Sequence, residues 1–116
     1  MSEIKRMQTG KRMSQAVVHN GLVYLAGQVG TAGGSTEQQT RDVLAKIDDL
    51  LHGAGTDKSR LLQAQIWLKS MDDFAVMNSV WDAWVAEGNT PARACVEASL
   101  ATPDYTVEIM VVAALP

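Results

Sequence analysis

The chain has 116 residues and a formal net charge of −3 at pH 7, and 47% of its residues are hydrophobic against 20% charged. These proportions are typical of a globular protein and exclude a disordered one, while the length predicts a single domain over residues 1–116. No run reaches the roughly 18 consecutive apolar residues that span a bilayer, and the first residues lack the apolar stretch of a signal peptide. We therefore expect a cytoplasmic protein with no membrane partner.

Side chains that bind metals or nucleic acids are few. His19 and His52 stand far apart without a neighbouring cysteine, and Cys95 is the single cysteine. We therefore expect no metal site and no intrachain disulfide. Four Lys and Arg residues between positions 5 and 12 form a small basic cluster, which we interpret as a solvated first strand and loop. Because the sequence pI is about 5.2, nucleic acid is not expected as a partner.

The first well-signalled element in chain order is a β-hairpin. Short apolar runs cover residues 16–19 and 22–26, and the dipeptide Asn20-Gly21 separates them. This dipeptide is a strong signal for a two-residue hairpin turn. The glycine-rich residues 30–34 that follow predict a flexible loop.

A helix is predicted next, over residues 36–52, because apolar residues recur there at helical spacing. Gly53 is the expected residue that ends it. A capping box can begin at either of two pairs, Ser35 with Gln38 or Thr36 with Gln39.

A second helix is predicted over residues 71–87, with a capping signal at Ser70 and Asp73 and a stop at Gly88. Its expected buried face carries large apolar side chains: Phe74, Met77, Trp81, Trp84 and Val85. At this spacing we interpret the tryptophans as core or interface residues and not as a ligand-stacking box.

The remaining residues predict strands. Apolar and polar residues alternate over 62–69 and 93–100, and residues 105–114 form a largely apolar run. This order of elements predicts one mixed sheet with both helices on one face. The other face would expose an apolar set from the last strand, either Val107, Ile109 and Val111 or Met110, Val112 and Ala114. Such a patch is unusual for a soluble monomer, so we expect a homo-oligomer whose sheets face each other.

Four segments together resemble the RidA (YjgF) family of reactive-intermediate deaminases. They are Ala26-Gly27-Gln28, Asp73-Phe74 with Asn78, Thr90-Pro91-Ala92-Arg93-Ala94-Cys95-Val96, and Val107-Glu108-Ile109. The resemblance covers nearly the whole chain, and the ordered set is fairly specific. It implies an α+β, chorismate-mutase-like fold with a mixed six-stranded sheet and two helices packed on one face. It also implies a homotrimer with clefts between subunits.

The resemblance further implies an activity. Family members hydrolyse reactive 2-imino and enamine acids to 2-oxo acids and ammonia, which is 2-iminobutanoate/2-iminopropanoate deaminase chemistry, and they need no metal or organic cofactor. The small-molecule substrate is a carboxylate. Two alternatives remain on the same scaffold: a non-catalytic module that binds or senses 2-oxo acids, and a protein-interaction or nucleolytic role.

Two catalytic residues are implied by the resemblance. Arg93 corresponds to the family's essential arginine, and a guanidinium grips a carboxylate with two parallel hydrogen bonds. Glu108 stands where the family has a glutamate that positions or activates water, a task that suits a carboxylate in a partly dry cleft. The alternative for either residue is a salt bridge without a catalytic role.

Three further residues are implied to bind substrate: Cys95, Gly27 and Asn78. The backbone at Cys95 is expected to help hold the carboxylate, and we reject a nucleophilic thiol because no histidine partner can be argued. Gly27 matches a position where the main chain approaches the ligand, or else it marks a bulge. Asn78 is expected to be more structural than catalytic.

Two positions depart from the family pattern. Met13 stands where members often have tyrosine, and Ala26 stands where several have serine. Both changes remove a hydroxyl group near the expected cleft. They do not change Arg93, which is expected to bind the carboxylate. The preferred imine substrate is not predicted by the sequence.

Overall fold

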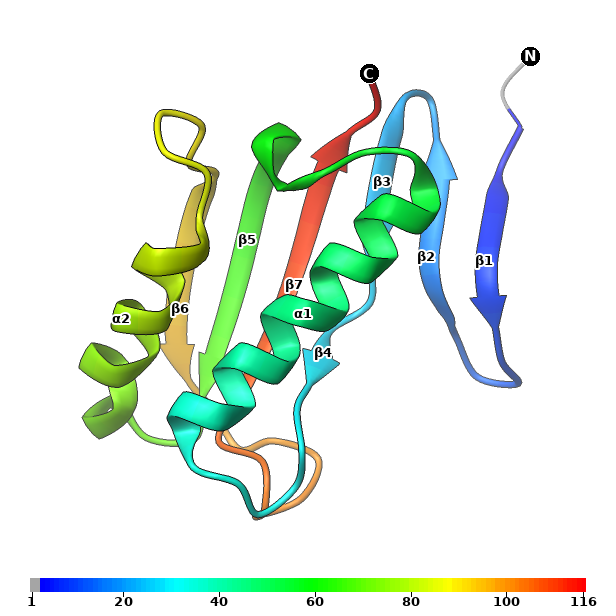
Figure 1. Ribbon diagram of the computed structural model, residues 1–116. Helices are drawn as coiled ribbons and strands as arrows, with labels where there is room; N and C mark the ends of the chain where they lie inside the picture. The colour runs from blue at the N-terminus through cyan, green and yellow to red at the C-terminus, as the bar shows by residue number, and fades with distance from the viewer. Residues whose placement is uncertain (1–2) are drawn as a thin grey trace.

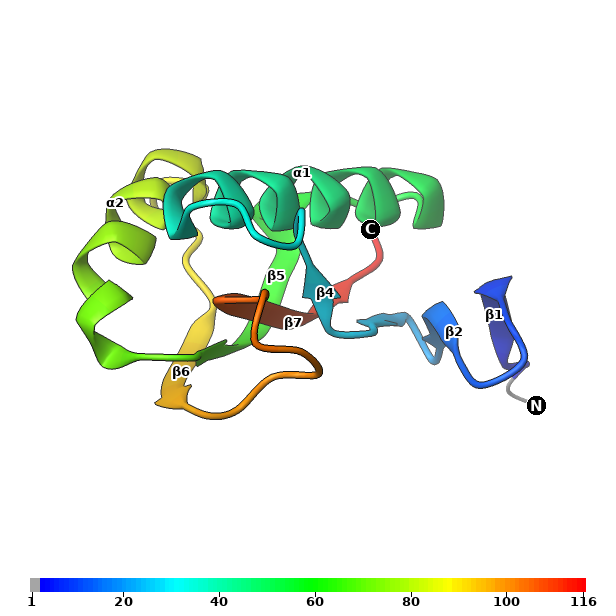
Figure 2. The same ribbon diagram turned by 90° about the horizontal axis from the view of Figure 1, so that it is seen from below.

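The computed structural model describes residues 3–116, and its two helices lie together on one face of a twisted sheet. Figure 2 shows both helices above the strands and no element below them. The main path of the sheet runs through six strands, in the order β1 (Lys5–Thr9), β2 (Ser14–His19), β3 (Leu22–Leu25), β7 (Val107–Ala114), β5 (Leu61–Leu68) and β6 (Ala92–Glu97) (Figure 1). Neighbours are antiparallel except β5 and β6, which are parallel. The expected mixed sheet with two helices on one face is confirmed.

A short seventh strand was not expected from the sequence. β4 (Gln28–Val29) pairs with β7 beside the end of β3. The hairpin between β2 and β3 is confirmed, because Asn20 and Gly21 both have positive φ angles, of 51° and 77°. A two-residue turn of this type needs that backbone conformation at both positions.

The first helix is longer at its C-terminus than expected. α1 (Thr36–Ala54) begins after Ser35, whose side chain accepts a hydrogen bond from the backbone N–H of Gln38. Ser35, and not Thr36, is therefore the capping residue. The predicted stop at Gly53 is wrong by two residues, because the helix ends at Gly55 in the left-handed conformation, with a φ of 92°.

The second helix is shorter than expected. The 3-10 turn η2 (Met71–Asp73) is capped by the Ser70 hydroxyl and leads into α2 (Phe74–Trp84). Val85 is already extended, so the predicted stop at Gly88 is wrong. The buried residues of α2 are Met77, Val80 and Trp81, while Phe74 is 37% exposed.

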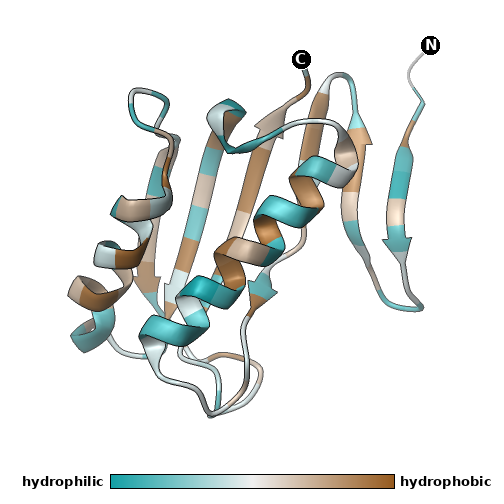
Figure 3. Cartoon of the chain, in the orientation of Figure 1, coloured by the Kyte–Doolittle hydropathy of each residue, from teal (hydrophilic) through white to brown (hydrophobic). Residues whose placement is uncertain are grey.

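The core lies between the helices and the sheet. β7 turns Val107, Ile109 and Val111 toward the helices, where they are fully or almost fully buried. In β5 the register shifts between Leu61 and Gln63, so that Leu61 is buried and Leu62 is exposed. The alternation predicted over residues 62–69 is therefore interrupted at Leu62, an apolar residue that is exposed. Beyond it, Figure 3 shows hydrophobic and hydrophilic residues alternating along β5.

The remaining strand boundaries differ by a few residues from expectation. β6 ends at Glu97 instead of residue 100, and β7 begins at Val107 instead of residue 105. A second 3-10 turn, η1 (Lys58–Arg60), leads into β5. Neither α1 nor α2, the helices found within residues 3–116, has the length and apolar character that crossing a membrane requires.

The face of the sheet away from the helices carries a shallow hollow of about 420 Å³. It is lined by side chains of three adjacent strands: Gln63, Gln65, Trp67, Val96, Met110 and Val112. No helix of residues 3–116 lies over this face in Figure 2. The apolar set on it is the one that contains Met110 and Val112. The homo-oligomer that would bury it stays a prediction.

Candidate functional site

Strand β6 places Arg93 at the edge of the sheet, on the side of the helices. Arg93 is opposite Ala64 in the β5–β6 register, and Ala64 is buried in the core. The guanidinium carbon of Arg93 lies 5.4 Å from the centre of the Trp81 ring and 6.0 Å from that of Phe74. Arg93 makes no ion pair within residues 3–116. The alternative interpretation, a structural salt bridge, therefore finds no partner in this part of the chain.

Cys95 shares this side of β6 with Arg93 and is half-buried. Burial raises the pKa of the Cys95 thiol, and the positive charge of Arg93 offsets that effect only in part. A thiol with a raised pKa is protonated at neutral pH and is a poor nucleophile. This environment does not favour a nucleophilic role for the Cys95 thiol.

Asn78 lies on the same face of α2 as the two rings, four residues after Phe74 and three before Trp81. Its side-chain oxygen is buried and accepts no hydrogen bond from any residue in 3–116. A buried acceptor without a partner costs roughly 1–3 kcal/mol. Asn78 therefore holds an unused acceptor on the helix face that contacts Arg93.

Glu108 lies on β7, and Gly27 gives it room. A Cβ atom at position 27 would overlap the carboxylate of Glu108, so only glycine fits there without displacing it. The side chain is half-buried, and burial raises the pKa of the Glu108 carboxyl. No cation pairs with Glu108 in the described chain, residues 3–116. A partly desolvated carboxylate of this kind is suited to general acid–base chemistry.

Arg93 and Glu108 lie on opposite faces of the sheet. Arg93 is opposite Ala64, which faces the helices, whereas Glu108 is opposite Trp67, which lines the hollow on the other face. The predicted site residues therefore form two groups. One group, on β6 and α2, holds Arg93, Cys95 and Asn78, and the other, around β4 and β7, holds Gly27 and Glu108.

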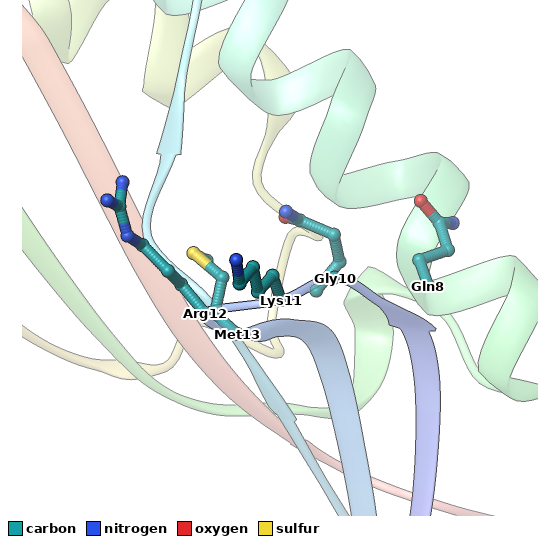
Figure 4. Close-up of a pocket in the computed structure, with 6 residues that line it drawn as sticks. Gln8, Gly10, Lys11, Arg12 and Met13 are labelled. Carbon is teal, nitrogen blue, oxygen red and sulfur yellow. The ribbon is translucent and has the colours of Figure 1, made fainter.

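Of the two departures from the family pattern, Ala26 directly precedes Gly27 of the second group. The backbone N–H of Ala26 donates to the Gln15 carbonyl, and the Gln28 amide donates to the Gln15 side chain at 2.8 Å. Met13 is 49% exposed in the loop just before Gln15. This loop borders an open pocket of about 580 Å³, and Figure 4 shows Lys11, Arg12 and Met13 projecting from it. The sequence singled out Met13 but gave no sign of this pocket.

The aromatic neighbours of Arg93 were also missed as site residues. Phe74 and Trp81 were expected in the core because their spacing is helical, and that spacing carries no information about which strand residue the helix covers. The carboxylates, histidines and cysteine of residues 3–116 include no group of three that could hold a metal ion.

Comparison with known proteins finds full-length relatives. The model of the Endoribonuclease L-PSP family matches residues 3–115. A RutC family protein of Haemophilus ducreyi is 45% identical over 113 residues, which are 97% of each chain. The RutC family protein YoaB of Escherichia coli is 42% identical over 112 residues, 97% of this chain and 98% of that protein. The crystal structure of NMB1025, a member of the YjgF protein family from Neisseria meningitidis, is 51% identical with a TM-score of 0.96, covering 98% of this chain and 96% of that one.

Proposed function

The chain belongs to the Endoribonuclease L-PSP (YjgF/RidA) family, and on that basis we propose that it hydrolyses 2-imino and enamine acids to 2-oxo acids and ammonia. The observation that carries the proposal is the state of Arg93. Its guanidinium is exposed on an edge strand, against aromatic rings, and has no carboxylate partner within residues 3–116. It is therefore available to bind the carboxylate that every such substrate carries.

Groups near Arg93 complement the rest of a 2-imino acid. The two parallel N–H donors of Arg93 bind the carboxylate, and the unpaired oxygen of Asn78 accepts the N–H of the imine. The backbone at Cys95 adds a contact to the carboxylate. These three residues account for substrate binding, and they leave the delivery of water to another group.

Glu108 supplies the acid–base chemistry. As a base it takes a proton from water while the oxygen adds to the carbon of the C=N bond, which gives a carbinolamine. It gives that proton to the nitrogen, which completes the carbinolamine. In the second step Glu108 takes the proton of the new hydroxyl group and delivers it to the nitrogen, so that the C=O bond forms as the C–N bond breaks and ammonia leaves. Burial raises the pKa of the Glu108 carboxyl, which makes its carboxylate a stronger base for the first transfer.

A complete site under this proposal needs two chains, because Arg93 and Glu108 lie on opposite faces of one sheet. We propose that Arg93 of one protomer meets Glu108 of another in a cleft between subunits of a homotrimer. The open face of the sheet, with its apolar hollow, supports an assembly of this kind.

The test is a coupled assay in which 2-aminoacrylate or 2-iminobutyrate is generated in situ and its decay is followed. We expect the protein to accelerate decay over buffer, and Arg93→Lys, which keeps the charge but loses the paired donors, to lower kcat/KM on the order of tenfold to a hundredfold. Arg41→Lys, on the exposed side of α1 beside Glu37, is the matched control. Equal rates for the wild type and Arg93→Ala would refute the proposal.

The second candidate is a 2-oxo acid binding module without turnover. The separation of Arg93 from Glu108 favours this candidate. The group on β6 and α2 holds Arg93 and does not need Glu108 to bind a carboxylate. Calorimetric binding of 2-oxobutyrate that is lost in Arg93→Ala, together with no acceleration of imine decay by the wild type, would select this candidate. RNA cleavage by the purified protein that Arg93→Ala abolishes would contradict both candidates.

A further inference from the structure

We propose that Phe74 and Trp81 are positioning residues, which hold the Arg93 guanidinium by its planar face and leave its N–H edge free for the substrate. This inference rests on the proposed function, because it takes a carboxylate as the ligand of Arg93. It adds two residues of α2 that do not themselves touch the reacting atoms.

The contact geometry supports a cation–π clamp. A guanidinium within about 6 Å of an aromatic ring centre is attracted to the ring face, and both ring distances, 5.4 Å and 6.0 Å, meet that limit. Phe74 and Trp81 are seven residues apart on α2, which places them two turns apart on one face of the helix. Arg93 therefore contacts two rings that a single helix presents together.

A second aromatic ring packs against Trp81. Trp81 is 4% exposed, and its ring centre lies 5.4 Å from that of Trp84. The indole N–H of Trp84 in turn donates to the carboxylate of Asp48 on α1, at 3.0 Å. A chain of contacts thus links Arg93 to both helices, and it limits the directions that the guanidinium can take.

The nearest acidic residue on the same side of β6 is held elsewhere. Glu97 shares this side with Arg93, but its carboxylate accepts a hydrogen bond from the backbone N–H of Met71, at 2.9 Å. A carboxylate paired with Arg93 would occupy the N–H donors that a substrate needs, whereas ring faces attract the charge and leave the donors unpaired. The clamp is therefore a way to preorganise an arginine without occupying its binding edge.

The first measurement needs no substrate. Ring currents shift the NMR signal of the Arg93 Nε–Hε group, and Arg93→Lys identifies that signal by its loss. We expect Phe74→Leu to move the signal toward the ordinary arginine position and Phe74→Tyr, which keeps the ring, to leave it in place. Phe74 is 37% exposed, so both variants should fold, and Trp81→Phe provides a second, conservative change. A signal that Phe74→Leu leaves unmoved would overturn the proposal.

The second measurement is a comparison of kinetics and binding. Phe74→Leu should raise KM for the imine, and the Kd for 2-oxobutyrate, about two- to fivefold with kcat nearly unchanged, and Phe74→Tyr should restore the wild-type values. In an Arg93→Gln background the same change should have no effect. An equal loss in both backgrounds would mean that the ring contacts the ligand directly, which contradicts the clamp. If the NMR signal moves as expected but the wild type neither binds nor turns over substrate, the proposed function fails and the clamp stands.

Discussion

Glu108 illustrates how one small neighbour controls the environment of a carboxylate. Gly27 lets the β3–β4 connection pass so close that the carboxylate of Glu108 loses part of its contact with water. Desolvation disfavours the charged form, which is why the pKa of the Glu108 carboxyl lies above its ordinary value of 4.5. Burial of this carboxyl therefore lowers the stability of the folded state when the group is ionised.

We predict that Glu108→Gln stabilises the protein at neutral pH. The folded state binds a proton more tightly than the unfolded state, so stability falls as the pH rises above 4.5 and the loss is complete once the pH exceeds the raised pKa. Below 4.5 both states are protonated and the penalty disappears. The urea midpoint of Glu108→Gln should therefore exceed that of the wild type at pH 7, and the two should converge as the pH falls below 4.5.

The exposed Glu87 provides the control, and Glu87→Gln should leave the midpoint at pH 7 unchanged. A midpoint that drops in Glu108→Gln at pH 7 would show that the ionised carboxylate is a net stabiliser, which contradicts the desolvation argument.

Candidate site residues could be named from the sequence, and their placement could not. Arg93 and Glu108 are candidates because ordered flanking residues resemble the family motifs. Their location on opposite faces depends on the register of β6 and β7 against β5. Strand alternation gives the relative side of residues within one strand, and it gives no relation between strands until the register is known.

At the level of elements, Gln39 on α1 connects two loops. It is fully buried, and its amide nitrogen donates to the carbonyls of Gly34, at 2.7 Å, and Asp104, at 3.0 Å. Its oxygen accepts the backbone N–H of Thr106 at 2.9 Å. One side chain thus satisfies three backbone groups at the entrances to α1 and β7, and it helps to set where β7 begins.

We predict that Gln39→Leu destabilises the fold by about 3 kcal/mol, because buried backbone groups lose their partners. The neighbouring Gln38→Leu, at an exposed position where the side chain contacts Asp42, should change stability by no more than about 0.5 kcal/mol. The free energy of unfolding in urea measures both. Similar losses for the two variants would rule out a special role for Gln39.

Element types followed from the sequence more closely than element ends did. Gly53 was expected to end α1, but a glycine inside a helix costs only about 1 kcal/mol, and the buried Leu50 and Leu51 hold that turn against the sheet. The register shift at Leu61 likewise changes which residue faces inward. Tertiary packing decides both features, so a local pattern cannot give them.

For the whole molecule, the order of elements predicted the layers correctly. Two helices on one face follow from the alternation of strands and helices. The position of β7 between β3 and β5 did not follow, because nothing local distinguishes a central strand from an edge strand when both are apolar. The uncovered apolar face was also predicted, because both alternating sets of residues in the last strand are apolar.

We predict that Met110→Glu disrupts the assembly. Met110 lies in the hollow of the open face, and a charge buried there between protomers would lack a partner. Light scattering should show a mass that falls toward the 12.5 kDa of one chain, and imine hydrolysis should fall with it. Val76→Glu, at a similarly exposed position on α2, should keep the mass of the wild type. A wild type of 12.5 kDa at micromolar concentration would contradict the prediction.

The central position of β7 also affects the order in which the sheet can form during translation. β7 joins the β1–β2–β3 unit to the β5–β6 unit, yet it follows all the other strands in the chain. Translation adds about 5–20 residues per second. Until β7 has been synthesised, the edges of β3 and β5 that pair with it stay without that partner. Pairing of β7 with both β3 and β5 is therefore the step that completes the sheet, whatever forms before it.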